Sequence, residues 1–311
     1  MAGNTFNETG YSGKSRSTEN EVQESKLKGF IDYIKLEHTV FDIPFIVAGS
    51  FIAAGKYPGT RIIILVILAG TLARATGMSI NRLLGKKYDV INPRKRQWGL
   101  VNGSLSTSSA ITFTVIVAAL FEFCTFLLNT FVFILSPVVL ALFIIDPMLK
   151  RITRWRHFFM GLTIGVGVMA GYLAVIPHFP SSPEIYILVI TTATWIGGFD
   201  MVYTIPDVEY DRQNDLKTVM TAYGIRNGMI ISDITHAFTL LFFTLLIFYI
   251  NSYFYAAELV LIYFLIIYQH YILDPDDTST VRVSFLNSNS FIGISFLTVL
   301  ILTQYLPAFA L

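Results

Sequence analysis

Long apolar stretches dominate this 311-residue chain and restrict it to one class of fold. Hydrophobic residues make up 54% of the sequence and charged residues 14%, against about a quarter charged in soluble domains. A helix needs about 20 apolar residues to cross a bilayer, and the apolar stretches repeatedly reach that length. Inside a bilayer a helix satisfies all its own backbone polar groups. We therefore predict an all-α, polytopic membrane protein.

The apolar stretches predict about nine transmembrane spans, at residues 40–56, 61–81, 107–126, 128–146, 157–176, 184–204, 228–250, 253–272 and 284–306. Long charged loops follow the second, fourth, sixth and eighth spans, and short loops follow the others. All but three of the 22 Lys and Arg residues lie in the N-terminal region or beside the long loops. The exceptions are Lys56, Arg61 and Arg74. Because basic residues favour the cytoplasmic side, we expect a cytoplasmic N-terminus and an external C-terminus.

Residues 1–28 differ from the rest of the chain. They are polar, rich in Ser, Asn, Glu and Gly, and lack the apolar core of a signal peptide. We interpret them as a disordered cytoplasmic tail, followed by one transmembrane domain at 29–311. The net charge of +1 gives no reason to expect a nucleic-acid partner. The single cysteine, Cys124, excludes an intrachain disulfide and a multi-cysteine metal site.

Two acidic clusters lie at the predicted cytoplasmic ends of the second and sixth spans, at residues 81–89 and 200–211. In the second cluster Asp200, Asp207 and Asp211 are seven and then four residues apart. On a continuous helix they would fall within roughly 40° of one another. Carboxylates at a membrane boundary cost free energy and need a partner. Oxygen ligands beside Lys and Arg suit a Mg²⁺-bridged phosphate compound, which favours an enzyme.

The order and spacing of several short motifs resemble the UbiA family of intramembrane prenyltransferases, closest to its aromatic-acid branch, which includes 4-hydroxybenzoate and menaquinone-pathway enzymes. The resemblance covers about residues 33–300. Its strongest segment runs from Gly198-Phe199-Asp200 to Asp211-Arg212. The others are Lys35 to Phe41 with Pro44-Phe45, Arg74 to Met78, Asn81-Arg82, Asp89 to Arg94, Lys150 to Thr153, Tyr268 to His270, and Phe285 to Asn289.

The resemblance implies a ring of helices around a central cavity that opens sideways to lipid. It implies that Mg²⁺ is held by Asn81 and Asp89 on one side and by Asp207 and Asp211 opposite, with Asp200 and Tyr203 supporting the second cluster. It implies that Lys150 and Arg151 meet the diphosphate of a polyprenyl donor, with Arg82, Arg94 and Lys217 as further candidates. The implied acceptor is a small aromatic acid in quinone biosynthesis. We expect a prokaryotic cell membrane, with the active site facing the cytoplasm.

The sequence departs from the family pattern at five positions. Gly85 replaces an expected metal-binding Asp, and Asp146 replaces a common Tyr. The remaining departures are Trp98 for Arg, Val101 for Pro, and Asp215 for Gly. Asp146 could compensate for Gly85 or pair with Lys150, and the sequence leaves both interpretations open.

Other interpretations remain open as well. The acceptor could instead be a glycerol ether, haem or a chlorin, and the chain could be a non-catalytic isoprenoid-binding protein. Arg74, inside a span, could position an anionic acceptor or form a buried ion pair. Glu37 and His38 could place the acceptor or begin a helix. Glycines at four-residue spacing in the span 157–176 predict close helix packing.

Overall fold

The computed structural model describes residues 33–34, 39–274, 277, 279–283, 288–306 and 308, and these residues form helices without a β-strand. The predicted tail at 1–28, the residues Lys35 to His38, and Asn287 lie outside the described residues. The all-helical fold class predicted from composition is confirmed for the described part of the chain.

In the described residues, a long helix coincides with each predicted span: α2 (Thr39–Ala54), α3 (Thr60–Asp89), α5 (Thr107–Leu128), α6 (Thr130–Ile152), α7 (Arg156–Leu173), α8 (Glu184–Tyr203), α11 (Ile225–Leu245), α13 (Tyr253–Tyr271) and α15 (Asn289–Tyr305). Short elements connect them: η2 (Pro93–Lys95), α4 (Gly99–Asn102), η3 (Ile205–Asp207), α9 (Val208–Gln213), α10 (Val219–Tyr223), α12 (Ile247–Ile250) and α14 (Ser279–Val283).

Six helices in the described part of the chain are long and apolar enough to cross a membrane, and α2 and α15 are shorter apolar helices. The chain is therefore an integral membrane protein. The count of nine spans and the side on which the N-terminus lies stay predictions.

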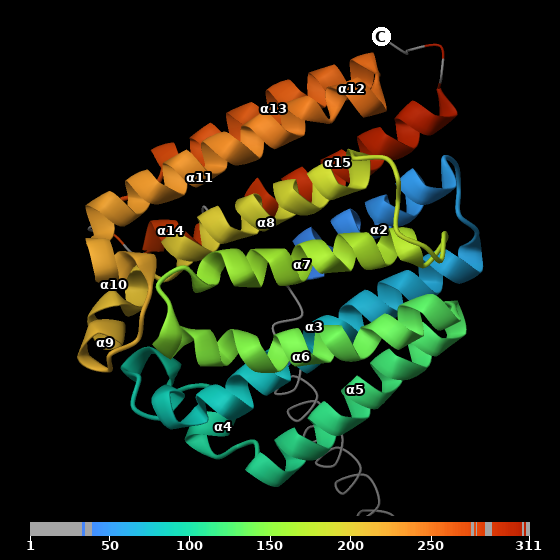
Figure 1. Cartoon of the computed structure of the whole chain (residues 1–311). Helices are drawn as coiled ribbons and strands as arrows, with labels where there is room; N and C mark the ends of the chain where they lie inside the picture. The colour runs from blue at the N-terminus through green and yellow to red at the C-terminus, as the bar shows by residue number, and fades with distance from the viewer. Residues whose placement is uncertain are drawn as a thin grey trace, which may run out of the picture.

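The long helices lie side by side, and the short helices α4, α9 and α10 gather at one end of the array (Figure 1). Polar side chains begin several of the helices. Ser106 accepts a hydrogen bond from the Ser109 amide at the start of α5, and Asn129 accepts one from the Val132 amide at the start of α6. Asn129 is also the single residue that separates α5 from α6.

An aromatic cluster joins α2 to α8, α11 and α15. The Phe45 ring lies 4.9 Å from Trp195 and stacks on Phe296 at 5.0 Å, and Phe243 completes the cluster at 6.2 Å. Such rings bury large apolar areas and contribute about 0.5–1.5 kcal/mol per pair beyond area burial. Through these ring contacts α2 packs against α8, α11 and α15 on one side.

The predicted close packing around α7 is confirmed. A Cβ atom at Gly171 would lie 1.9 Å from the Ile46 carbonyl oxygen of α2, and one at Gly161 would lie 2.1 Å from the Ala193 carbonyl oxygen of α8. Only glycine lets the backbones approach so closely. Helix α7 is thereby held tightly between α2 and α8.

Two elements differ from the expected boundaries. Helix α3 continues to Asp89, past the end predicted for the span 61–81, so the whole first acidic cluster lies on a helix. The second cluster does not lie on one continuous helix, because α8 ends at Tyr203 and a 3₁₀ turn containing Pro206 follows. Proline lacks an amide hydrogen and its ring collides with the preceding turn. Asp200 therefore does not share a stripe with Asp207 and Asp211.

Candidate active site

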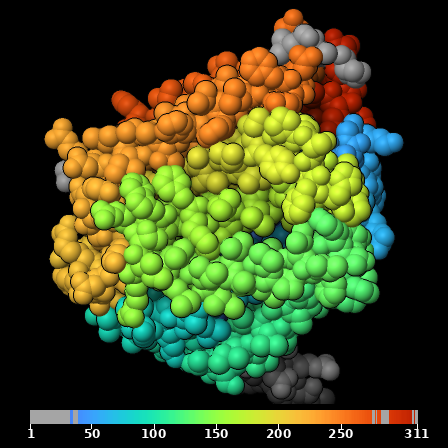
Figure 2. Space-filling model, viewed as in Figure 1, coloured from blue at the N-terminus to red at the C-terminus, as the bar shows by residue number. Residues whose placement is uncertain are grey.

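A cavity of about 380 Å³ lies among α2, α3, α5, α6 and α7. Its wall is mostly apolar, and the polar residues Asp42, Arg74, Asn81 and Asp146 line the part nearest the acidic clusters. In Figure 2 a hollow is visible between α6 and α7. An apolar cavity with a few polar groups at one end suits a long apolar ligand with a charged head.

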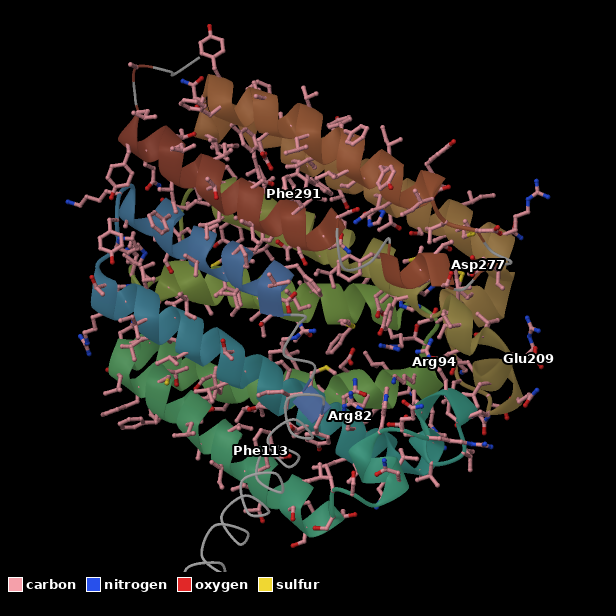
Figure 3. The ribbon with its side chains drawn as sticks, turned by 180° about the vertical axis from the view of Figure 1, so that it is seen from behind. Arg82, Arg94, Phe113, Glu209, Asp277 and Phe291 are labelled. Carbon is pink, nitrogen blue, oxygen red and sulfur yellow. The ribbon has the colours of Figure 1, made fainter. Side chains whose placement is uncertain are left out.

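The two acidic clusters meet at one end of the helix array. The Asn92 side-chain amide donates to Asp207 Oδ1 at 3.2 Å, and Arg94 forms an ion pair with Asp207 Oδ2 at 2.8 Å. The Tyr210 hydroxyl donates to the Tyr88 carbonyl oxygen. Figure 3 shows Arg82, Arg94 and Glu209 toward this same end. These segments lie more than 100 residues apart in the sequence. Together, residues 81–95 and 203–211 form the charged end of the helix array, which we call the rim.

The Asp89 carboxylate forms an ion pair with Lys95. Lys95 Nζ lies 2.8 Å from Asp89 Oδ1, and both side chains are largely buried. One turn before Asp89, a Cβ atom at Gly85 would meet Asp89 Oδ2 at 3.6 Å, an ordinary contact distance. The space beside Asp89 therefore accepts a side chain that this sequence lacks.

Trp98 forms a platform for two cations. The Arg82 guanidinium lies 3.8 Å from the Trp98 ring centre, and Lys95 Nζ lies 4.9 Å from it. Such contacts contribute about 0.5–2 kcal/mol, more when they are shielded from water. Arg82 is 4% exposed and also lies over the Tyr33 ring. Burial raises the pKa of the Tyr33 phenol, so this neutral hydroxyl donates to the Ser79 carbonyl oxygen.

The other predicted diphosphate ligands lie at the end of α6. The Arg151 guanidinium lies 4.7 Å from the Tyr88 ring centre, beside the α3 cluster. The Lys150 carbonyl oxygen accepts from the Lys217 amide at 2.6 Å, which ties α6 to the segment after α9. The Lys217 ammonium points to the Ile152 carbonyl oxygen at 3.4 Å, at the end of α6.

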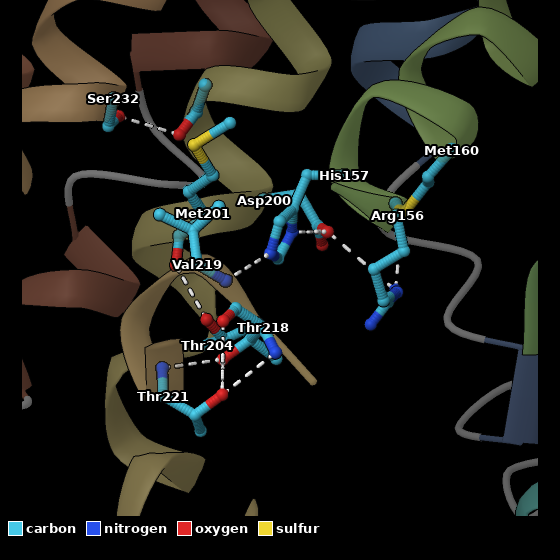
Figure 4. A network of polar contacts seen from close by, with 11 residues as sticks. Arg156, His157, Met160, Asp200, Met201, Thr204, Thr218, Val219, Thr221 and Ser232 are labelled. Carbon is cyan, nitrogen blue, oxygen red and sulfur yellow. Dashed lines mark hydrogen bonds and ion pairs between the residues drawn. The ribbon is translucent and has the colours of Figure 1, made fainter. Parts of the chain in front are cut away.

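Asp200 belongs to a separate buried network (Figure 4). His157 Nδ1 lies 2.7 Å from Asp200 Oδ2, and Arg156 lies 3.7 Å from the same oxygen. The Val219 amide donates to His157 Nε2 at 3.4 Å, which leaves the His157 proton on Nδ1, facing Asp200. This network joins α7, α8 and α10 behind the rim. The Asp200 carboxylate is thus held by residues of α7, whereas Asp207 is held by residues that follow α3.

The remaining predicted residues lie around the rim and the cavity. Tyr203 is half-buried at the end of α8. Asp146 is buried on the cavity wall, and its Oδ1 atom has no hydrogen-bond partner. No salt bridge joins it to Lys150 within the described residues, but the two charges lie close enough to interact electrostatically, which agrees with the pairing interpretation. Arg74 pairs with Asp42 on the opposite wall, which agrees with the buried-pair interpretation.

The donor set partly fits a divalent metal ion. No three His, Cys, Asp or Glu side chains are assembled as a metal site in the described part of the chain. Asp211, however, is 9% exposed, and no salt bridge of its carboxylate is found there. Together with Asp207, four residues earlier, it offers the carboxylate oxygens that Mg²⁺ prefers. On the α3 side, Lys95 already holds Asp89.

Three contacts of the site are not predicted by the sequence. In the sequence, Asn92 stands out only as part of a motif, and no pattern distinguishes Lys95 or His157. A basic residue in a charged loop carries no distinguishing pattern, and a histidine at the start of a span is common. Their partners, Asp207, Asp89 and Asp200, are distant in sequence or on another element, so only the fold reveals the contacts.

Comparison with known proteins identifies the family. Residues 43–293 match the model of the UbiA prenyltransferase family. A 4-hydroxybenzoate octaprenyltransferase of Haemophilus ducreyi is 27% identical over 243 residues, covering 78% of this chain and 86% of the relative. One of Vesicomyosocius okutanii is 23% identical over 244 residues, covering 78% of this chain and 88% of the relative.

Two solved structures share the fold. The apo structure of a UbiA homologue from Aeropyrum pernix K1 has a TM-score of 0.77 at 26% identity, covering 86% of this chain and 98% of the homologue. A UbiA homologue from Archaeoglobus fulgidus, bound to DMAPP and Mg²⁺, has a TM-score of 0.69 at 15% identity, covering 89% and 99%. The helical cavity with its charged rim and these matches agree, and the chain belongs to the UbiA family of prenyltransferases.

Proposed function

We propose that this prenyltransferase moves a polyprenyl group from its diphosphate to a small aromatic acid in quinone biosynthesis. The observation that carries the proposal is the charged rim at one end of an apolar cavity. The cavity wall suits a polyprenyl chain, and the rim suits its diphosphate head. The relatives named 4-hydroxybenzoate octaprenyltransferase support an aromatic acid as the acceptor.

The rim residues have two roles in binding the diphosphate head group: the acids bind the metal ion, and the cations interact with the diphosphate itself. Asp207 and Asp211 would hold Mg²⁺, and Asn81 and Asp89 are the ligands that the family resemblance implies on α3. The cations Lys150, Arg151, Arg82, Arg94 and Lys217 surround the same end of the helices and offset the charge of the diphosphate. Bound Mg²⁺ would supply a further positive charge to the diphosphate oxygens. Asp200 and Tyr203 support the second cluster, Asp200 through the His157 and Arg156 contacts.

The reaction needs charge stabilisation more than acid–base chemistry. The donor C1–O bond breaks, and its electron pair stays on the departing diphosphate. Arg151, Lys150 and Arg94 stabilise that developing charge because they are already oriented toward the rim. An apolar cavity keeps water from the allylic cation. The electron-rich ring carbon of the acceptor then forms the new C–C bond to C1 and releases its proton.

Arg74 offers a place for the acceptor's carboxylate. It lines the cavity two helical turns before Asn81, and the Phe41 ring lies 5.5 Å from its guanidinium. Arginine binds carboxylates through paired hydrogen bonds. The acceptor's carboxylate would replace that of Asp42, which holds Arg74 in this structure.

Purified protein in liposomes tests the function. We expect product from geranylgeranyl diphosphate, Mg²⁺ and 4-hydroxybenzoate, detected by mass spectrometry, and none after Asp207→Asn or Asp211→Asn. Asp277→Asn is the matched control, because Asp277 is exposed on the loop after α13 and is not among the proposed ligands. Full activity of either rim variant would refute the assigned residues.

The same assay distinguishes the other acceptors and the non-catalytic alternative. Product only with a glycerol ether, haem or a chlorin would replace the aromatic acid with that acceptor. Binding of the donor without any product across the panel would identify an isoprenoid-binding protein. Because Lys and Arg are concentrated on one side, we place the rim at the cytoplasmic face of a prokaryotic membrane, which impermeant labelling of an Arg94→Cys variant in oriented vesicles would check.

A further inference from the structure

The α3 side of the rim holds fewer carboxylates than the Asp207 side. Asp89 has no acidic neighbour one turn earlier, because that position is Gly85. The Cβ position of Gly85 faces the Asp89 carboxylate at 3.6 Å, so an aspartate there would begin beside the first carboxylate. At phosphate sites Mg²⁺ takes one or two carboxylates together with waters and substrate oxygens, so Asp89 with the Asn81 amide offers the smaller of the two donor sets.

A cation of the chain occupies the position beside Asp89. Lys95 Nζ lies 2.8 Å from Asp89 Oδ1, with side chains that are 14% and 10% exposed. The Trp98 ring holds the same ammonium at 4.9 Å, and Arg82 lies on that ring as well. Removing one partner of such an enclosed pair would leave a buried charge unpaired, so the pair is difficult to separate.

The Asp207 side differs. Arg94, its ion-pair partner, is 40% exposed, and exposed pairs of this kind contribute little and exchange readily. Asp211 is buried, and within the described residues its carboxylate takes part in no salt bridge. A divalent ion at Asp207 and Asp211 would therefore displace one exposed arginine and neutralise one buried acid.

We infer that Lys95 replaces a metal ion on the α3 side of the site, so that the protein binds its donor with a single divalent ion, held by Asp207 and Asp211. An ammonium has three hydrogens to donate: one goes to Asp89, and those that do not face the Trp98 ring would be left for the diphosphate. The inference rests on the proposed function and defines how the head group is held. It proposes a different role for Asp89 from the metal-ligand role that the family resemblance implies for Asn81 and Asp89.

Counting bound ions tests the inference directly. The full chain in nanodiscs is saturated with geranylgeranyl thiodiphosphate, an unreactive donor analogue, and titrated with Mn²⁺, which is followed by electron paramagnetic resonance. We expect one ion per chain in the unmodified protein. We expect two in the variant that combines Gly85→Asp with Lys95→Met, because two carboxylates then face each other without the ammonium.

Matched variants locate the ion. Lys87→Met removes a charge from the same end of α3 and should leave one ion, since Lys87 is exposed and its ammonium lies over the Tyr88 ring. Asp211→Asn should remove the ion, whereas Asp89→Asn should retain it. The Asp89→Asn result keeps the test decisive if the double variant does not fold.

The outcomes separate the inference from the proposed function. Two ions in the unmodified protein, one in the double variant, or loss of the ion in Asp89→Asn would each overturn the role of Lys95. No ion at all with the analogue bound would overturn the single-ion site. Failure of the unmodified protein to bind the analogue would instead refute the proposed donor and with it the proposed function.

Discussion

Asp215 has a backbone φ of 54°, in the left-handed region that most side chains avoid. This explains the departure from the family pattern, in which glycine is usual at this position. Glycine adopts such a φ without steric cost, and aspartate is among the few other residues that tolerate it. The backbone conformation is thus kept while the residue type differs.

Replacing Asp215 tests that explanation. Asp215→Gly should stabilise the folded protein by about 1 kcal/mol, because the steric cost of the left-handed conformation disappears. Asp215→Ala should destabilise it, since alanine lacks a polar side chain to favour this conformation. Thermal unfolding in detergent measures both variants. Shifts in the same direction would contradict the explanation.

At the scale of single residues, the sequence indicates which charged groups lie at the site, but it does not indicate which partners they contact. The spacing of Asp207 and Asp211, and the family motifs around Asn81 and Lys150, correctly predict which end of the helix array is charged. The sequence does not reveal that Lys95 binds Asp89, because the contact depends on how the loop after α3 turns back. It also gives no sign that Asp200 is bound by His157, a residue on another helix.

At the scale of helices, apolar length locates every long helix but not every boundary. Helix α3 extends past its apolar part because residues 82–89 contain no helix breaker other than Gly85, and Pro93 comes only later. Helix α8 stops early because Pro206 follows it. In both cases local backbone chemistry, and not hydropathy, decides where the helix ends.

The glycines of α7 provide a prediction at this scale. Gly171→Ala should destabilise the protein by about 1–3 kcal/mol, because the new methyl group would overlap the Ile46 carbonyl oxygen at 1.9 Å. Gly167→Ala, four residues earlier, should be tolerated, since its methyl group would meet only the end of the Ile46 side chain at 3.2 Å. Equal stability of the two variants in thermal unfolding would show that α7 and α2 are not packed as described.

At the scale of the whole molecule, the fold serves to bring two distant segments together. Helices α2, α3, α5, α6 and α7 enclose the cavity, while α8 with η3 and α9 carries the second acidic cluster to its charged end. The link between Asn92 and Asp207 spans 115 positions of the chain. The positive-inside pattern predicts that these segments share a membrane face, although their direct contact follows only from the fold.

Disulfide formation between cysteines at positions 92 and 207, in a Cys124→Ser background, tests this convergence most directly. A pair at Ser106 and Ser109, whose hydroxyls lie 2.9 Å apart away from the rim, controls for reactivity. The account predicts that the 92–207 pair cross-links within one chain at a rate comparable to the control pair, because the two side chains lie within hydrogen-bond distance. Failure of the 92–207 pair to cross-link while the control pair reacts would contradict it.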